Sequence, residues 1–204
     1  MARDTQSIVK MSRREGYALH PKAHKILAKR SVQPGGVHGG RPNQTSQYAT
    51  QLREKQKVKR LYGLLEKQFS NLMAEALKKH GPTGELLLEF LERRLDSVIY
   101  RSSFANSRRA ARQLVTHGHF MLNGRRVDIP SIRVSLGDEI SIRPASKSNN
   151  YFKNIDDLSP AGSDKPAWLN VDRKKFQITI TGMPTREEAE PDINEQLIVE
   201  YYSR

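Results

Sequence analysis

Apolar side chains recur at helical spacing through residues 46–79 of this 204-residue chain. Intervals of three and four residues place them on one face of a helix. Gly81–Pro82 ends the stretch, and Gly63 is the natural break within it. The pattern therefore predicts one long helix or two helices in succession. The apolar positions are Tyr48, Leu52, Val58, Leu61, Tyr62, Leu65, Phe69, Leu72, Met73 and Ala76.

Two more helices are predicted further along the chain. Thr83 suits the N-cap of a helix that runs to about Arg101. The next helix spans residues 107–118, because Ser107 suits its N-cap and Gly118 suits the position just past its last turn. Its inner face is formed by Ala111, Leu114 and Val115.

The pattern then changes to that of a small antiparallel sheet. Asn123–Gly124, the strongest short hairpin signal, separates the apolar stretch 120–122 from residues 125–127. Apolar and polar residues also alternate on both sides of a turn at residues 136–139. The apolar face of these strands, which we expect to cover the two preceding helices, carries Ile132, Val134, Ile140 and Ile142.

The remaining segments have weaker patterns. Residues 1–45 lack sustained periodicity and are rich in Pro and Gly, which favours an extended basic arm. Residues 144–165 are polar and predict a loop or linker, whereas residues 193–202 alternate like a strand that packs back on the body.

Together these elements predict an α+β protein with four parts. The parts are the extended basic arm 1–45, a helical domain 46–92 onto which residues 186–204 pack back, a small module 93–153 of two helices on a short antiparallel sheet, and a loop and return segment 154–185.

Charge identifies the class of partner. The chain has 35 Lys and Arg against 22 Asp and Glu, a net charge of +13, so a polyanion is expected. Residues 1–60 hold 14 basic and 3 acidic side chains, and residues 93–143 hold 10 and 4. Residues 154–204 instead hold 6 and 10. This uneven distribution favours two nucleic-acid-binding regions over a charge that serves only solubility.

Two helix faces concentrate this charge. Arg108, Arg109 and Arg112 lie three and four apart, so we expect them to project together from the helix that Ser107 begins. On the first helical stretch, Arg53, Lys57 and Arg60 share a face, flanked by Lys55 and Lys59. Both faces suit phosphate contacts, and a merely solvated surface is the alternative.

Several classes of chemistry are excluded or disfavoured. The chain has no Cys, which excludes disulfides, thiolate zinc sites, iron–sulfur clusters and a Cys nucleophile. No apolar run approaches the roughly 18 residues of a membrane span, so a cytoplasmic location without a membrane partner is expected. His20 and His24 have the spacing of metal ligands, but Pro21 intervenes and no third ligand is evident, so no metal or cofactor is predicted.

Three blocks resemble the family of the fourth protein of the small ribosomal subunit, over nearly the whole chain. Residues 48–69 are similar to the family's helical-domain block, and residues 92–127 to the RNA-binding module named after the family. Residues 192–200 are similar to its C-terminus. The module alone also occurs in RNA-modifying and tRNA-handling proteins, so the order of all three blocks makes the match specific.

The resemblance implies a structural protein of the 30S subunit in the ribosome. Its expected partners are 16S rRNA, at a multi-helix junction of the 5′ domain, the mRNA in the channel through which it enters the subunit, and the fifth small-subunit protein. The resemblance also implies roles in early assembly and decoding accuracy. Relatives often carry cysteines in the arm and several arginines where this chain has only Arg41, so neither a metal nor strong mRNA unwinding is expected there.

The RNA contacts are expected from basic side chains of the arm, the first helix and the module, with His38 and Tyr48 as stacking residues. The predicted set is Arg3, Lys10, Arg13, Arg14, Lys22, His38, Arg41, Tyr48, Arg53, Lys55, Lys57, Arg60, Arg93, Arg108, Arg109, Arg112, Arg125 and Arg126.

Two alternatives belong to other classes. Arg94–Leu95–Asp96 resembles a tripeptide of pseudouridine synthases that carry the same module, but too few residues follow Arg143 for their catalytic domain. A DNA-binding helix-turn-helix regulator is disfavoured, because neither a dimerisation heptad nor an effector domain is evident. The sequence therefore predicts an RNA-binding protein that is not an enzyme.

Overall fold

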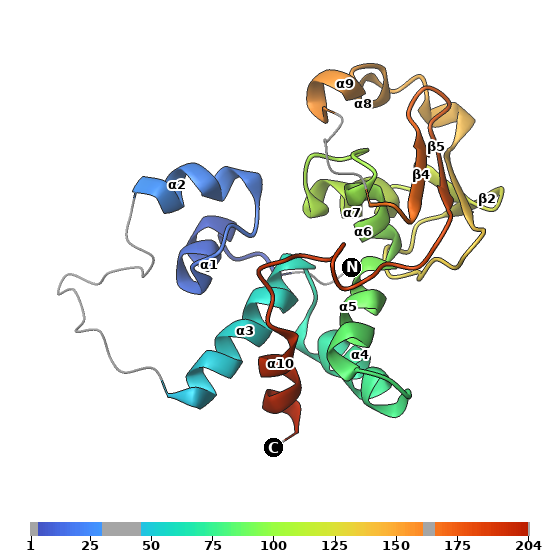
Figure 1. Cartoon of the computed structure of the whole chain (residues 1–204). Coiled ribbons are helices and arrows are strands. Elements are labelled where there is room, and N and C mark those ends of the chain that lie inside the picture. Colours follow the sequence, from blue (N-terminus) through green and yellow to red (C-terminus); the bar gives the residue numbers. More distant parts are fainter. Residues whose placement is uncertain (1–3, 30–45, 161–165, 204) are drawn as a thin grey trace. The chain divides into compact units, whose positions relative to one another are not determined.

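Helices make up most of the described part of the first half of the chain, and a small sheet with short helices makes up most of the described part of the second (Figure 1). The structure is a computed structural model that describes residues 4–29, 46–160 and 166–203. It divides into two units. The helical unit comprises Met1–Leu87 and Asp192–Arg204, and the sheet unit comprises Leu88–Pro191.

The helical unit is built around α3, against which α10 and α1 pack. Its apolar interior includes Met11, Val58, Phe69, Met73 and Ile198, which are all buried. Its elements are α1 (Ile8–Glu15), η1 (Pro21–Ala23), α2 (His24–Lys29), α3 (Gln47–Leu61), α4 (Glu66–Lys78), the first part of α5 (Thr83–Glu92) and α10 (Glu195–Tyr202).

The predicted helical stretch forms two helices, and Gly63 is the reason. Its φ of +64° is the left-handed conformation that glycine adopts without strain. The Leu64 N–H donates to the Lys59 carbonyl at 2.9 Å and the Gly63 N–H to the Arg60 carbonyl at 3.2 Å. These two bonds form a Schellman motif that ends α3.

The expected extended arm is wrong for its described part, which is helical. The Ser12 side chain accepts a hydrogen bond from the Leu19 N–H at 3.2 Å, and His20 Nδ1 accepts one from the Lys22 N–H at 3.1 Å. Met11 and Ala23 are buried. Helices of eight and six residues are too short to give a sustained periodic signal. Arg3, His38 and Arg41 lie outside the described residues.

The strand expected at residues 193–202 is also wrong, because these residues form α10. Asn194 caps the helix by accepting a hydrogen bond from the Leu197 N–H at 3.4 Å. Ile193 and Ile198 are buried. A short run of consecutive apolar residues, as at 197–199, fits a buried strand and a helix equally well.

In the described part of the sheet unit, five antiparallel strands form one sheet in the order β2-β1-β3-β5-β4. Phe120 of β1 pairs with Val127 of β2 and Ile142 of β3, and Ile140 pairs with Ile178 of β5. The elements after α5 are α6 (Leu95–Arg101), α7 (Arg108–Thr116), β1 (Phe120–Leu122), β2 (Arg125–Val127), β3 (Glu139–Ile142), η2 (Pro144–Ser146), α8 (Asn150–Lys153), α9 (Ile155–Leu158), β4 (Leu169–Asp172) and β5 (Gln177–Ile180).

One hydrophobic core joins these helices to the sheet, which confirms the α+β class. Phe120, Ile140 and Ile178 of the sheet are buried together with Val98 of α6 and Val115 of α7. Two further predictions are confirmed. Asn123 and Gly124 have φ values of +49° and +76° in a two-residue loop, as a type I′ turn requires, and Gly118 has a φ of +69° just after α7.

Two predictions in this unit are wrong. The helix from Thr83 breaks at Arg94, whose backbone is extended, so that α5 and α6 are separate. The strand predicted at Ile132 and Val134 is absent, because that segment bonds instead to residues 93–95: Leu95 N–H donates to the Ile132 carbonyl at 2.8 Å. β5 takes the position beside β3.

Residues predicted as loop also have regular structure. The polar stretch 144–165 includes η2, α8 and α9, and Phe152 and Ile155 within it are buried. β4 and β5 lie in the segment 154–185 that was expected to be a loop. Among the described residues, no helix has both the length and the apolar character needed to cross a membrane.

The close approach of α10 to α5 in the helical unit predicts an effect of Gly84→Ala. Helix propensity alone favours Ala over Gly by about 1 kcal/mol. A Cβ on Gly84 would, however, lie 2.5 Å from Glu195 Cγ and 2.8 Å from Glu195 Cβ. Because these atoms are close to the α10 backbone, we expect Gly84→Ala to lower the free energy of unfolding by about 1–3 kcal/mol in urea titrations.

The matched control is Glu85→Ala, the exposed neighbour on the same helix. It should change the free energy of unfolding by less than about 0.5 kcal/mol. A Gly84→Ala variant more stable than wild type would mean that α10 does not constrain this position.

Candidate nucleic-acid interface

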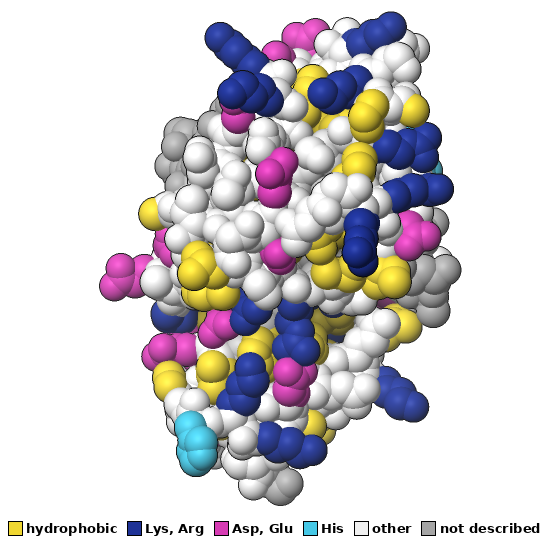
Figure 2. Space-filling view, turned by 90° about the vertical axis from the view of Figure 1, so that its right-hand side faces the viewer, with side chains coloured by type: hydrophobic (Ala, Val, Ile, Leu, Met, Phe, Trp, Pro, Cys, Tyr) yellow, Lys and Arg dark blue, Asp and Glu magenta, His cyan; other side chains and the backbone are white. Residues whose placement is uncertain are grey.

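Lysine and arginine side chains are spread over the face drawn in Figure 2, with aspartate and glutamate side chains among them. This mixture matters because a cation paired to a carboxylate of its own chain is less available to a phosphate. The ion pairs within each unit therefore decide which of the predicted cations can serve RNA.

On α3, all of the predicted cations have carboxylate partners. Arg53 and Arg60 both donate to the same Glu15 oxygen, Arg53 at 3.2 Å. Lys57 Nζ lies 2.8 Å from Glu54 Oε1. Lys55, which is buried, lies 2.6 Å from Glu66 Oε1, and Lys59 lies 2.9 Å from Glu66 Oε2.

The pKa values of Glu15 and Glu66, the two carboxyls outside α3 that pair with its cations, shift in opposite directions. Burial raises the pKa of the Glu15 carboxyl, although Arg53 and Arg60 act to lower it. Burial also opposes ionisation of Glu66, but hydrogen bonds from Lys55 and Lys59 outweigh it and lower the pKa of that carboxyl. The predicted cations of α3 therefore stabilise the fold through ion pairs. Of these four side chains, that of Arg53 is the most exposed, at 35%.

Other predicted residues of the helical unit are better placed for an external ligand. Lys10 and Arg14 on α1 and Lys22 on η1 are exposed, and Arg13 is half-buried. The Tyr48 side chain is 48% exposed, with its ring centroid 5.7 Å from that of Tyr201.

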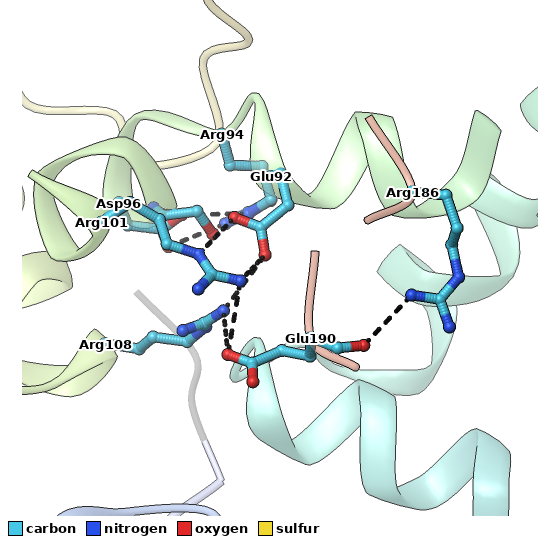
Figure 3. A network of polar contacts seen from close by, with 8 residues as sticks. Glu92, Arg94, Asp96, Arg101, Arg108, Arg186 and Glu190 are labelled. Atoms are coloured by element: carbon cyan, nitrogen blue, oxygen red, sulfur yellow. Dashed lines mark hydrogen bonds and ion pairs between the residues drawn. The ribbon is translucent and has the colours of Figure 1, made fainter. Parts of the chain in front are cut away.

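In the sheet unit, an ion-pair network draws two arginines inward. Glu92, which is only 1% exposed, accepts two hydrogen bonds from Arg101 at 2.8 and 3.0 Å and one from Arg108 at 3.2 Å. Arg108 also lies 3.0 Å from Glu190. Figure 3 shows the Arg101 and Arg108 guanidinium groups converging on these two carboxylates. Glu190 comes from the segment after β5, and its backbone carbonyl accepts from Arg186 at 3.3 Å.

A second group of ion pairs surrounds Asp96. Arg94 donates to both of its carboxylate oxygens at 3.0 and 3.1 Å, and the Ser97 N–H donates at 3.1 Å. Arg112 Nε lies 3.4 Å from Asp96 Oδ2. Burial lowers the pKa of Arg112, although Asp96 acts to raise it.

These contacts correct the expectation that three arginines of α7 project together. Arg108 and Arg112 turn toward carboxylates of the sheet unit, and Arg109 is exposed. Arg93 is half-buried, because it bonds to Glu89 at 2.8 Å and to the Val134 carbonyl at 2.9 Å. Helical spacing identified the face but not the partners, one of which lies 82 residues away in the sequence.

The β1–β2 hairpin and the C-terminal end of α7 form a more open basic surface. Arg125 and Arg126 are exposed on β2. A Cβ on Gly118 would meet Arg126 Nε at 2.6 Å, so the Arg126 guanidinium lies directly over the end of α7. We call this surface the hairpin cluster, and it comprises His117, His119, Arg125, Arg126 and Arg143.

Histidine 119 lies within the hairpin cluster and is held by the fold. Its Nδ1 is 3.0 Å from Ser146 Oγ, and its carbonyl accepts from the Arg143 N–H at 2.9 Å. Burial lowers its pKa, and the nearby His117, Arg143 and Arg126 lower it further. The sequence analysis missed the residues of this cluster other than Arg125 and Arg126, although the basic position directly after β3 was a signal for Arg143.

The surroundings of Asp96 and His20 disfavour a catalytic role for Asp96 and a metal site at His20. The Asp96 carboxylate is nearly buried and fully engaged by Arg94 and the Ser97 N–H, so it does not resemble a free catalytic acid. His20 Nδ1 already accepts from Lys22. Within the described ranges, no three His, Asp or Glu side chains are grouped so that they could hold a metal ion.

Comparison with known proteins gives full-length matches. The pattern described as "Ribosomal protein S4/S9 N-terminal domain" matches residues 3–92, and that described as "S4 domain" matches residues 93–140. The chain is 49% identical to small ribosomal subunit protein uS4 of Chloroflexus aurantiacus over 207 residues and 48% identical to that of Chlorobaculum tepidum over 205. The uS4 protein of Herpetosiphon aurantiacus is 47% identical over 211 residues. Each match covers 100% of both chains.

The Glu92 network predicts a large effect of Glu92→Gln on stability. The substitution keeps the shape of the side chain but removes the buried charge that Arg101 and Arg108 share, although both arginines still lie near Glu190. We expect the free energy of unfolding to fall by about 3–5 kcal/mol in urea titrations near neutral pH. Glu89→Gln is the matched control, because Glu89 pairs with Arg93 at a partly exposed site and should cost less than about 1 kcal/mol. Equal effects of the two substitutions would contradict the role of Glu92.

The opposite pKa shifts of Glu66 and Glu15 predict opposite effects on acid sensitivity. The folded pKa of Glu66 lies below its ordinary value of 4.5, so its stabilisation is present above that pH and is lost as the pH falls through the folded pKa. Glu66→Gln should therefore flatten the loss of stability below pH 4.5. Glu15 has a raised folded pKa, so its ionisation weakens the fold as the pH rises through that value, and Glu15→Gln should steepen the acid loss.

Urea midpoints measured across a pH series distinguish the two carboxylates. The Glu66→Gln difference from wild type should develop below pH 4.5, and the Glu15→Gln difference above it. If both substitutions changed the curve of urea midpoint against pH in the same direction, the opposite pKa shifts of Glu15 and Glu66 would be contradicted.

Proposed function

Because this chain belongs to the family of small ribosomal subunit protein uS4, we propose that it binds ribosomal RNA as a structural component of the small subunit. We further propose that its target is a multi-helix junction in the 5′ domain of 16S rRNA and that binding there helps to nucleate subunit assembly. Family membership supports the first statement over the full length of the chain.

The proposed RNA-binding surface rests on one observation: some of the predicted cations are paired with carboxylates, whereas others are exposed to solvent. Cations on α3 and two arginines of α7 are paired with carboxylates of their own unit. Arg109 in the first turn of α7 and Arg125 and Arg126 of the hairpin cluster are instead exposed on short, well-packed elements. Lys10, Arg14 and Lys22 provide a second exposed set in the helical unit. We propose that these six side chains make phosphate contacts.

The physical mechanism is neutralisation of RNA phosphates with release of counterions. A-form RNA hides its base edges in a deep and narrow groove, so a folded junction is recognised mainly through its backbone, 2′-hydroxyls and splayed bases. The partly exposed Tyr48 could stack on such a base. The ion pairs within each unit keep the scaffold in place, so that the exposed cations match one RNA geometry.

The wider placement on the ribosome is also a proposal. The resemblance supports a position beside the channel through which mRNA enters, contact with the fifth small-subunit protein, and an influence on decoding accuracy. The chain acts without catalysis in this role. Uridine isomerisation is disfavoured by the engaged carboxylate of Asp96.

Equilibrium binding tests the proposed target. The purified chain should bind a 5′-domain fragment of small-subunit rRNA far more tightly than scrambled RNA or duplex DNA of equal length at physiological salt. With roughly 6–10 phosphate contacts, affinity for the fragment should fall by roughly 10³- to 10⁵-fold between 50 and 200 mM salt. Equal affinity for all three nucleic acids would reject the junction as a specific target.

The exposed arginines of the sheet unit predict the effect of replacing two of them. Arg109→Ala combined with Arg126→Ala should weaken binding to the fragment and lower the slope of log affinity against log salt by about 0.7–0.9 per lost contact. The free energy of unfolding should change little, because both side chains are exposed.

Lys67→Ala is the matched control, since Lys67 is exposed on α4 outside the basic regions. Its salt slope should equal that of wild type. An unchanged slope in the double variant would remove Arg109 and Arg126 from the phosphate contacts.

A further inference from the structure

The two-residue loop of the β1–β2 hairpin contains a dipeptide that is chemically reactive in flexible peptides. Asn123 is the one asparagine in the sequence that is followed by glycine. Because Gly124 has no Cβ, its backbone nitrogen is sterically open to attack the side-chain carbonyl of Asn123. That reaction converts asparagine to aspartate or isoaspartate.

Solvent exclusion does not protect this dipeptide. Asn123 and Gly124 are both exposed, and a Cβ built on Gly124 would meet no atom within 4 Å. Water can therefore reach the loop, and no neighbouring atom shields the Gly124 nitrogen. Any protection must come from the conformation of Asn123 itself.

Both polar atoms of the Asn123 side chain are fixed to the turn that precedes β3. Asn123 Nδ2 donates to Asp138 Oδ1 at 2.8 Å, and Asn123 Oδ1 accepts from the Glu139 N–H at 2.9 Å. The Asn123 N–H also donates to the Glu139 carbonyl at 2.8 Å. Asp138 is held in turn, because its second oxygen accepts from the Ser135 N–H at 2.7 Å.

We propose that Asn123–Gly124 is a latent deamidation site that Asp138 and the Glu139 backbone keep closed in the folded chain. Attack requires Cγ of Asn123 to swing toward the Gly124 nitrogen, and that rotation breaks both side-chain hydrogen bonds. The site opens when the hairpin separates from the 135–139 turn or when the chain unfolds.

The reaction needs only water. The Gly124 nitrogen forms a bond to Asn123 Cγ and loses its proton, while the Cγ–Nδ2 bond breaks and ammonia leaves. Water then opens the resulting five-membered imide at either carbonyl. One product is aspartate with the normal backbone, and the other is isoaspartate, in which the backbone runs through the side-chain carbon.

Modification would change the charge beside the hairpin cluster. A carboxylate at position 123 would face that of Asp138 and would lie two residues before Arg125. Like charges at this distance disfavour the turn. This consequence rests on the proposed function: the modified hairpin should bind the 5′-domain RNA fragment more weakly.

The test compares rates of modification at position 123 by peptide mapping with mass spectrometry, in the full chain incubated at neutral pH. Folded wild type should react at least roughly tenfold more slowly than the same chain in urea. Asp138→Ala should accelerate the folded chain on the order of tenfold, because it removes a charged hydrogen-bond acceptor. Asp128→Ala, which removes an exposed carboxylate just after β2, is the control and should match wild type.

Two more variants keep the test decisive. Gly124→Ala in the Asp138→Ala background should suppress the product, because a side chain obstructs the attacking nitrogen. If circular dichroism finds Asp138→Ala unfolded, Asp138→Asn replaces it; a single amide oxygen serves Asn123 and Ser135 less well, so modification should again exceed wild type.

A folded wild type that reacts as fast as the urea-unfolded chain would overturn the proposal. So would folded Asp138 variants that react at the wild-type rate. These rates are measured without RNA, so they test the deamidation proposal independently of RNA binding. The RNA arm compares separated intact and modified chains, and equal affinities there would overturn only the effect on binding.

Discussion

The buried charge of Glu92 is the constraint around which the sheet unit is arranged. A carboxylate that is 1% exposed is tolerated only with paired cations, and Arg101 and Arg108 supply them. Arg101 ends α6 and Arg108 begins α7, so this pairing fixes the connection between the two helices that cover the sheet. It also holds Glu190 and the segment leading out of the unit.

The same rule in the helical unit explains why a basic sequence does not have an equally basic surface. Glu15 is buried between Arg53 and Arg60, and Glu66 pairs with Lys55 and Lys59. Each carboxylate uses two cations, so few acidic residues neutralise much of α3. The proposed RNA contacts shift accordingly, from the long basic helix toward short elements whose cations face solvent. The same basic sequence thus supplies both the buried ion pairs and the exposed cations.

Sequence patterns predicted those parts of the fold that depend on local chemistry. The cap at Ser107, the left-handed Gly118 and the Asn123–Gly124 turn are confirmed, since each depends on residues within one turn of chain. Two of the errors involve partners distant in sequence. The 132–134 segment bonds to residues 93–95 rather than to β3, and β5 pairs with β3 across a long connection. In the candidate site, spacing identified Arg108 and Arg112 as surface cations, but it contains no information on Glu190 or Asp96.

The division of the chain has a consequence for the order in which it is made. The sheet unit is one continuous stretch, Leu88–Pro191, so all of its residues are present before α10 is synthesised. The helical unit is discontinuous, and Gln51 of α3 meets Glu200 of α10 at 2.8 Å, 149 residues later in the sequence. Domains generally fold during synthesis from the N-terminus onward. Here α3 must wait for α10, so the helical unit is completed after the sheet unit that lies within it in the sequence.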